Sequence, residues 1–270
     1  MSFLNKLASA SKRNASLLCV GLDPDPDLMG ERDIFLFNKA IIDATSDLVC
    51  AYKPNSAFYE AMGIQGLEAL IKTRDYIPAH IPVILDAKRG DIGNTSLFYA
   101  RAVFDTYGFD AVTVSPLLGR DSLEPFMGYR DKGVFILCRT SNPGASDFQD
   151  LNSSHGSELV RPLYQVIAQK AVEWNGYGNL ALVVGATYPG ELRIVREICP
   201  DMTILVPGVG PQGGDLEAAL GAGLDRNKAG LIINSSRGVI YASRSEDYPE
   251  AAHKAAQTLR DNINSVVDKI

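Results

Sequence analysis

The chain has 270 residues, of which 46% are hydrophobic and 21% are charged, and its formal net charge is −6. This length is normal for one α/β barrel, and the apolar fraction is that of a globular protein with a sizeable core. The negative charge and the lack of a Lys/Arg stripe argue against a nucleic-acid partner, and no apolar run is long enough to span a membrane.

Short apolar runs alternate with longer amphipathic segments along the chain. Residues 1–7 are too short and too polar for a signal peptide and predict a short N-terminal helix. Eight runs rich in Val, Ile and Leu lack polar alternation, which is typical of strands buried on both faces of a parallel sheet. They are residues 17–22, 48–52, 83–86, 111–114, 133–138, 180–184, 203–206 and 231–234.

Between these runs, apolar residues recur at three- and four-residue spacing, which predicts amphipathic helices. The clearest are residues 33–46, 59–76, 94–104, 158–174 and 249–267. Asn94, Thr95 and Ser96 are of types that cap the first turn of a helix, so the third helix is expected to begin there.

Eight strand-then-helix units in a chain of this length predict an α/β fold, namely a (β/α)8 TIM barrel. Residues 1–270 are expected to form a single barrel domain that includes the short N-terminal helix. The alternative is a doubly wound open sheet. It is disfavoured because no G-x-G-x-x-G motif follows the first strand and no linker divides the chain.

Asp86, Lys88 and Asp91 form a D-x-K-x-x-D motif where the third predicted strand ends. Three charges at the end of a buried strand are costly unless they stabilise one another or a ligand. A lysine held by two aspartates stays protonated, so it suits a positioned acid better than a Schiff-base nucleophile. Taken alone, the motif is equally consistent with a structural ion-pair cluster at the rim of a sheet.

Other polar residues also follow predicted strands, where a TIM barrel carries its catalytic groups. Lys53 follows the second strand and would complete an alternating array of two ammonium and two carboxylate groups. A glycine-rich segment that begins at Pro207 follows the seventh strand, and Arg237 follows the eighth, which together predict a phosphate site. Asp23 follows the first strand, where it either accepts hydrogen bonds from a sugar hydroxyl or caps the turn before Pro24.

Cys19, Cys50, Cys138 and Cys199 are scattered and form no C-x-x-C motif. At this chain length they are expected to be buried, reduced thiols, which favours a cytoplasmic location. The three histidines lack metal-ligand spacing, so no metal site is predicted.

The motifs together resemble those of orotidine 5′-phosphate decarboxylases, specifically the longer bacterial-type subgroup. The matching segments appear in family order and span nearly the whole chain. They are residues 21–24, 53–60, 86–95, 141–144, 207–215 and 237–241. The D-x-K-x-x-D core alone is shared with related decarboxylases and aldolases of sugar phosphates, so the resemblance depends on the full set.

This resemblance implies decarboxylation of orotidine 5′-phosphate to uridine 5′-phosphate in pyrimidine synthesis, without a metal or an organic cofactor. Lys88 would deliver a proton to C6 of the pyrimidine, and Asp86 would lie against the departing carboxylate. Lys53 and Asp23 would hold the ribose and order the charged array.

The resemblance also implies a homodimer, in which Asp91 reaches across the interface into the partner's site with Thr95 beside it on the ribose. The remaining residues implied to bind substrate contact the base or the phosphate. Ser141 would contact the pyrimidine edge, Gln212 would bridge base and phosphate, and Arg237 would grip the phosphate near Pro207.

Two alternatives remain open. A Mg-dependent sugar-phosphate decarboxylase or aldolase on the same barrel would use Asp86 and another acid as metal ligands. Against it, Lys53 is placed to compete with a cation, and Ser141 with Gln212 suits a flat base. A catalytically silent phosphate-binding barrel would have a broken Lys/Asp array, whereas all four members are present here.

Overall fold

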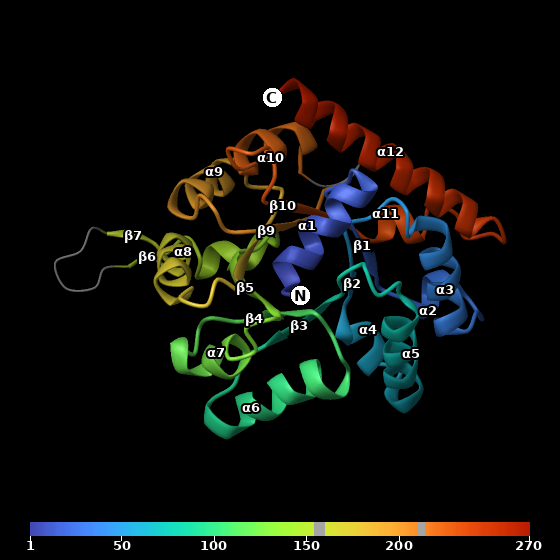
Figure 1. The fold of residues 1–270 in the computed structure, drawn as a ribbon, viewed down its shortest axis with the longest axis horizontal. Helices are drawn as coiled ribbons and strands as arrows, with labels where there is room; N and C mark the ends of the chain where they lie inside the picture. Colours follow the sequence, from blue (N-terminus) through green and yellow to red (C-terminus); the bar gives the residue numbers. More distant parts are fainter. Residues whose placement is uncertain (154–159, 210–213) are drawn as a thin grey trace.

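The centre of the molecule is a sheet of eight parallel strands surrounded by helices (Figure 1). The computed structural model describes residues 1–153, 160–209 and 214–270. The strand order is β2-β1-β10-β9-β8-β5-β4-β3. Parallel bridges from Tyr52 to Val83 and from Asn55 to Asp86 join β2 to β3 and close the sheet. The fold is the (β/α)8 TIM barrel that the sequence predicts.

The barrel strands agree with the predicted ranges to within three residues at either end. They are β1 (Leu18–Leu22), β2 (Ala51–Pro54), β3 (Ile84–Arg89), β4 (Ala111–Val114), β5 (Gly133–Arg139), β8 (Leu180–Val184), β9 (Ile204–Pro207) and β10 (Leu231–Ser235). The sequence did not predict a further antiparallel pair outside the barrel. It consists of β6 (Asn152–Ser153) and β7 (Arg161–Pro162).

Helix α1 precedes the first strand, and the other helices follow barrel strands and cover the outside of the sheet. The described helices are α1 (Phe3–Asn14), α2 (Pro26–Met29), α3 (Ile34–Thr45), α4 (Ser56–Glu60), α5 (Gly63–Tyr76), α6 (Gly93–Arg101), α7 (Arg120–Met127), α8 (Leu163–Trp174), α9 (Pro189–Ile198), α10 (Leu216–Gly223), α11 (Arg237–Ile240) and α12 (Tyr248–Lys269). A π-helical turn, Ala102–Thr106, extends α6, and a 3-10 turn, Pro143–Asp147, follows β5. Among the described helices, none is both long and apolar enough to cross a membrane.

The helices predicted over residues 59–76 and 158–174 differ from the structure in their continuity or in where they begin. The segment predicted as one helix over residues 59–76 is two helices, and the second starts at Gly63 with a φ of +64°. Glycine adopts such a φ without strain, so it permits a sharp break where the apolar spacing continues. The helix predicted over residues 158–174 begins at Leu163, because the residues just before it pair as β7.

The predicted capping of the third helix is also wrong. The helix begins at Gly93, and its N-cap position is Ile92, which makes no side-chain hydrogen bond. Asn94, Thr95 and Ser96 therefore lie inside the first turn. The N-terminal helix is longer than predicted, since α1 continues to Asn14.

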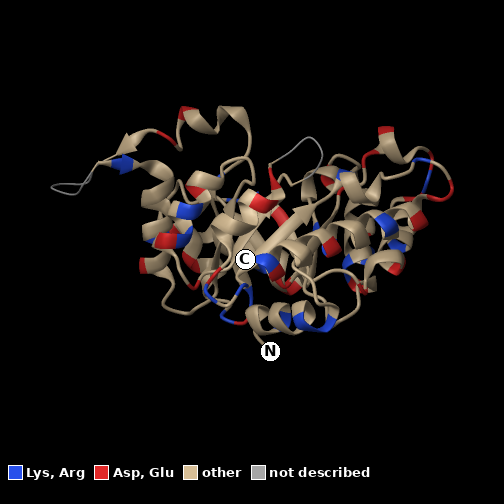
Figure 2. Cartoon of the chain, turned by 90° about the horizontal axis from the view of Figure 1, so that it is seen from above, with Lys and Arg blue, Asp and Glu red and all other residues tan. Residues whose placement is uncertain are grey.

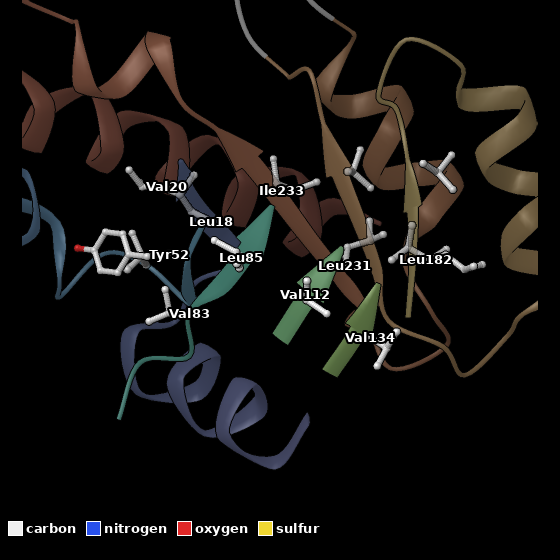
Figure 3. Close-up of a cluster of buried hydrophobic side chains, with 14 of the residues drawn as sticks. Leu18, Val20, Tyr52, Val83, Leu85, Val112, Val134, Leu182, Leu231 and Ile233 are labelled. Atoms are coloured by element: carbon white, nitrogen blue, oxygen red, sulfur yellow. The ribbon is translucent and has the colours of Figure 1, made fainter. Parts of the chain in front are cut away.

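Hydrophobic side chains of the strands point alternately into the barrel and out toward the helices. Outward-facing residues such as Leu18, Val20 and Ile233 pack in the layer between sheet and helices (Figure 3). Inward-facing residues such as Cys19 and Ile232 form a second, smaller core inside the barrel. Because both faces are buried, the strands are continuous apolar runs in the sequence.

Helix α1 closes the amino-terminal end of the barrel. Phe3 packs edge-on against Phe135, with ring centroids 5.6 Å apart, and Gly133 leaves room for this ring because a Cβ there would lie 2.5 Å from it. The Lys6 ammonium lies 2.8 Å from Asp110 Oδ2. The carboxyl ends of the strands therefore form the open end, which we call the mouth, and α1 forms the floor.

Charged residues of both signs lie on the outside of the barrel. In Figure 2, basic and acidic residues are interspersed over the outer helices. The four cysteines are buried and free, as predicted. Three of them lie in or beside barrel strands, whereas Cys199 follows α9.

Candidate active site

The mouth of the barrel contains a cavity of about 540 Å³. Several of the residues singled out in the sequence line it, together with apolar side chains from β5, β8 and β9. The polar lining includes Lys53, Asp86, Lys88, Thr113 and Ser141, and Pro207 also lines the cavity. Strands that are neighbours in the sheet supply the charged members, because β2 and β3 end side by side.

Asp86 lies at the centre of a chain of ion pairs. Its Oδ2 atom accepts a hydrogen bond from Lys53 Nζ at 2.8 Å, and its Oδ1 atom accepts one from Lys88 Nζ at 2.7 Å. The Lys53 side chain is 5% exposed, whereas that of Lys88 is 49% exposed. Two ammonium groups thus share one carboxylate, and the second ammonium is open to the cavity.

The mutual charges hold these buried groups in their ionised forms. Burial acts to raise the pKa of Asp86, but the charges of Lys53 and Lys88 and their hydrogen bonds hold that pKa well below its ordinary value. Burial likewise acts to lower the pKa of Lys53, yet the charges of Asp86 and Asp23 outweigh it and raise that pKa. Both side chains are therefore ionised at neutral pH.

An irregularity in β3 aims Lys88 into the mouth. The four-residue step from Leu85 to Arg89 on β3 lies opposite the two-residue step from Val112 to Val114 on β4. Lys88 has a φ of +48°, an uncommon conformation for a residue with a side chain. Such bulges disrupt the ladder locally and redirect side chains, and they recur beside active sites.

Asp23 forms hydrogen bonds with residues that follow β10 and β2, the two strands on either side of β1. Its Oδ2 atom accepts a hydrogen bond from Ser236 Oγ at 2.6 Å, and its Oδ1 atom accepts one from the backbone N–H of Asn55 at 3.2 Å. The next helix is capped by Asp25 instead. These bonds hold Asp23 near the Lys53–Asp86–Lys88 ion pairs, so Asp23 is not a local turn cap.

Asp91 and Thr95 lie outside this chain of ion pairs. Asp91 Oδ1 accepts a hydrogen bond from the adjacent backbone N–H of Ile92 at 2.8 Å. Within the described part of the chain it forms no ion pair. Thr95 is exposed on α6. A single chain thus supplies one of the two carboxylates that the D-x-K-x-x-D motif was expected to place around Lys88.

The segment after β5 presents Ser141 to the cavity, and Arg139 anchors it. Arg139 is buried, donates hydrogen bonds to the Thr140 carbonyl at 3.0 Å and to Asp150 at 3.1 Å, and lies 3.9 Å over the Tyr188 ring. A Cβ at Gly185 would lie 2.7 Å from Ser141 Cβ, so the segment packs tightly on the barrel.

The predicted phosphate-binding residues lie at the ends of β9 and β10. Arg237 begins α11 with an exposed side chain, which makes no hydrogen bond or ion pair to residues 1–153, 160–209 or 214–270. Pro207 is the last residue of β9, and Gly208 follows with a φ of +90°. Gln212 lies outside the described residues.

Sequence reasoning gave no role to Thr113 or Arg139, although both contact predicted site residues or their loop. One usable signal was present, because Thr113 is a polar residue in the apolar run 111–114. The alternative of a metal site needed a second acid beside Asp86. In the described part of the chain, no group of three or more His, Cys, Asp or Glu residues gathers as a metal site would require.

Comparison with known proteins gives consistent matches over nearly the full chain. Residues 16–255 match the model of the orotidine 5′-phosphate decarboxylase / HUMPS family. The orotidine 5′-phosphate decarboxylase of Thermomicrobium roseum is 54% identical over 273 residues, which cover 98% of this chain and 96% of that protein.

Solved structures also match over nearly the full chain. The structure of Leishmania donovani OMP decarboxylase superposes with a TM-score of 0.86 and 43% identity, covering 99% of both chains. Leishmania donovani UMP synthase gives a TM-score of 0.88 and 45% identity over 99% of this chain. The match spans 57% of that longer protein, little more than half its length.

Proposed function

The chain belongs to the orotidine 5′-phosphate decarboxylase / HUMPS family, and we propose that it converts orotidine 5′-phosphate to uridine 5′-phosphate in pyrimidine synthesis. The observation that carries the proposal is the Lys53–Asp86–Lys88 chain of ion pairs beside the cavity at the barrel mouth. This arrangement presents a fixed positive charge to a bound anion.

The proposed chemistry creates negative charge that the substrate cannot spread. When the bond between C6 and the carboxylate breaks, its electron pair stays on C6 in the ring plane, where the π system cannot accept it. Enzymes accelerate reactions by about 10⁶- to 10¹⁷-fold, and this reaction needs the upper end of that range. A pre-placed Lys88 ammonium stabilises the developing carbanion and then transfers an Nζ proton to C6.

Asp86 has two proposed roles. It holds the ammonium groups of Lys53 and Lys88 in place, as its short hydrogen bonds support. As an ionised group beside the substrate carboxylate, it also raises the energy of the ground state, and this repulsion disappears as neutral CO2 leaves.

The rest of the nucleotide supplies binding energy away from C6. We propose that Arg237 binds the phosphate together with the backbone near Pro207, and that Gln212 bridges phosphate and base. Ser141 contacts the pyrimidine edge, while Asp23 and Lys53 bind the ribose. Binding energy from the remote phosphate can then be used to orient C6 against Lys88.

We also propose a homodimer in which Asp91 and Thr95 complete the partner's site. The support is that Asp91 has no cationic partner in the described part of its own chain. Exposed apolar residues follow it in the sequence, since the adjacent Ile92 is 60% exposed and Phe98 on α6 is 58% exposed.

Residues 1–270 are proposed to be one domain, and the free buried thiols support a cytoplasmic location.

The proposed mechanism needs neither a metal nor an organic cofactor, because Lys88 supplies the positive charge. The ultraviolet absorbance of orotidine 5′-phosphate mixed with the protein tests the function in one cuvette, with and without EDTA. We expect the substrate absorbance to decay at the same rate in both. Loss of activity with EDTA would favour a Mg-dependent enzyme, and an unchanged spectrum would favour a barrel that only binds phosphate.

A further inference from the structure

Thr113 lies on β4 opposite the irregular part of β3, between the register pairs Leu85–Val112 and Arg89–Val114. It is buried, and it lines the cavity at the mouth. Where a regular ladder would continue backbone hydrogen bonds between the strands, the Thr113 side chain makes two bonds to β3 instead. One goes to the backbone of Lys88 and the other to the side chain of Asp86.

The chemistry of the partners fixes the direction of both hydrogen bonds. The backbone N–H of Lys88 can only donate, so Thr113 Oγ1 accepts from it at 2.9 Å. The ionised Asp86 carboxylate can only accept, so Thr113 Oγ1 donates its single proton to Asp86 Oδ1 at 2.9 Å. Thr113 therefore has one defined orientation, and it ties together the backbone that carries Lys88 and the carboxylate that pairs with its ammonium.

We propose that Thr113 is a positioning residue for the decarboxylation, which holds the Asp86 carboxylate and the Lys88 backbone in the geometry that aims the ammonium at the substrate. This inference rests on the proposed function. Lys88 has a long, half-exposed side chain and an uncommon backbone conformation, so neither feature alone fixes its direction. Thr113 compensates on both counts, because it satisfies the Lys88 N–H and limits rotation of Asp86.

Three variants separate positioning from a general contribution to stability. Thr113→Val keeps the shape but removes the hydroxyl, and Thr113→Ser keeps the hydroxyl. Thr45→Val is the matched control, because Thr45 is equally buried and its hydroxyl bonds to the Ile41 carbonyl at 2.7 Å and to Tyr52 at 2.8 Å. Thr45 does not line the mouth cavity.

Steady-state assays with orotidine 5′-phosphate, together with urea unfolding of each variant, test the proposal. We expect Thr113→Val to lower kcat by roughly 10- to 100-fold, the loss of one hydrogen bond to a charged group, while KM stays within about threefold. Thr113→Ser should retain kcat within about threefold. Thr45→Val should lose stability with little change in kcat, as expected when the role is structural alone.

Three results would overturn the proposal: an unchanged kcat in Thr113→Val, an equal loss in Thr113→Ser, or a loss confined to KM. A crystal structure of Thr113→Val decides the question without reference to turnover. We expect Asp86 and Lys88 to shift or disorder, and unchanged positions would contradict a positioning role. If the unmodified protein fails to consume orotidine 5′-phosphate, the proposed function fails. The crystal structure of Thr113→Val then still tests whether Thr113 positions Asp86 and Lys88.

Discussion

The two ends of the barrel contain the same kind of ion pair in different settings. At the floor, Lys6 lies 2.8 Å from Asp110, and at the mouth, Lys53 lies 2.8 Å from Asp86. Both pairs are largely buried. At the floor, Asp110 pairs with one ammonium, and its Oδ2 atom also accepts a hydrogen bond from the backbone N–H of Val83 at 2.9 Å. The mouth pair has an additional ammonium, that of Lys88, which faces a cavity.

This difference shows how one fold uses the same residue types for stability and for chemistry. The floor cluster joins α1 to the strands, and its opposite charges balance. At the mouth, the ammonium groups of Lys53 and Lys88 share the Asp86 carboxylate, the charge of Asp23 also acts on Lys53, and the Lys88 ammonium stays open to the cavity. A fixed ammonium open to a cavity is what is expected of a site built to bind and stabilise negative charge.

The largest expected effect comes from removing the additional ammonium. Lys88→Ala should lower turnover of orotidine 5′-phosphate by about 10³-fold or more, because the developing carbanion loses its stabilising charge. Nucleotide binding should remain. Lys6→Ala is the matched control at the floor, and it should retain kcat while losing stability in urea. Near-normal turnover by Lys88→Ala would remove the functional contrast between the two ends.

The second prediction concerns the carboxylate that the mouth lacks in a single chain. Lys88→Ala and Asp91→Ala protomers should each be inactive, whereas an equal mixture should recover about a quarter of the normal rate through hybrid dimers with one intact site. Turnover after subunit exchange measures this recovery. If exchange is confirmed and no activity returns, each site is built from one chain.

At the floor, Asp110→Ala should reduce the free energy of unfolding by about 1–3 kcal/mol, because the Lys6 ammonium and the Val83 N–H lose a buried acceptor. The kcat of the folded enzyme should stay within about twofold, since the mouth is unaffected. Urea unfolding and the absorbance assay on the same sample measure the two effects. A large fall in kcat would mean that the two ends are coupled.

The smallest effect is on the pH dependence of stability. The pKa of Asp86 in the folded protein is lowered below its ordinary value of 3.8, so its stabilising contribution is present above that value. The contribution is lost as the pH falls through the folded pKa. Urea unfolding below about pH 5 should therefore show a shallower loss of stability in Asp86→Asn than in the unmodified protein. Parallel curves would indicate that Asp86 titrates normally.

The sequence predicted the strands well because both faces of each are buried, so a run such as residues 180–184 is apolar throughout. It also predicted that Lys53, Asp86 and Lys88 meet, since all three lie where neighbouring parallel strands end. The bulge in β3 and the positive φ of Lys88 were not predictable, because they depend on how β3 pairs with β4.

Other features depend on contacts that residue type does not reveal. The break before Gly63 is hidden because the apolar spacing continues across it. Thr113 stands out as the polar residue of the run 111–114, but its role is hidden because threonine is common in strands of every kind. Arg139 looks like one more charged residue at a strand end, yet it is buried and anchors the loop that carries Ser141.

A crystal structure of the protein with uridine 5′-phosphate bound tests the central claim most directly. The account predicts the phosphate on Arg237 and Lys88 Nζ within about 3–3.5 Å of C6, the distance of a near-attack arrangement. A nucleotide seated in the mouth with Lys88 directed away from its ring would contradict the account.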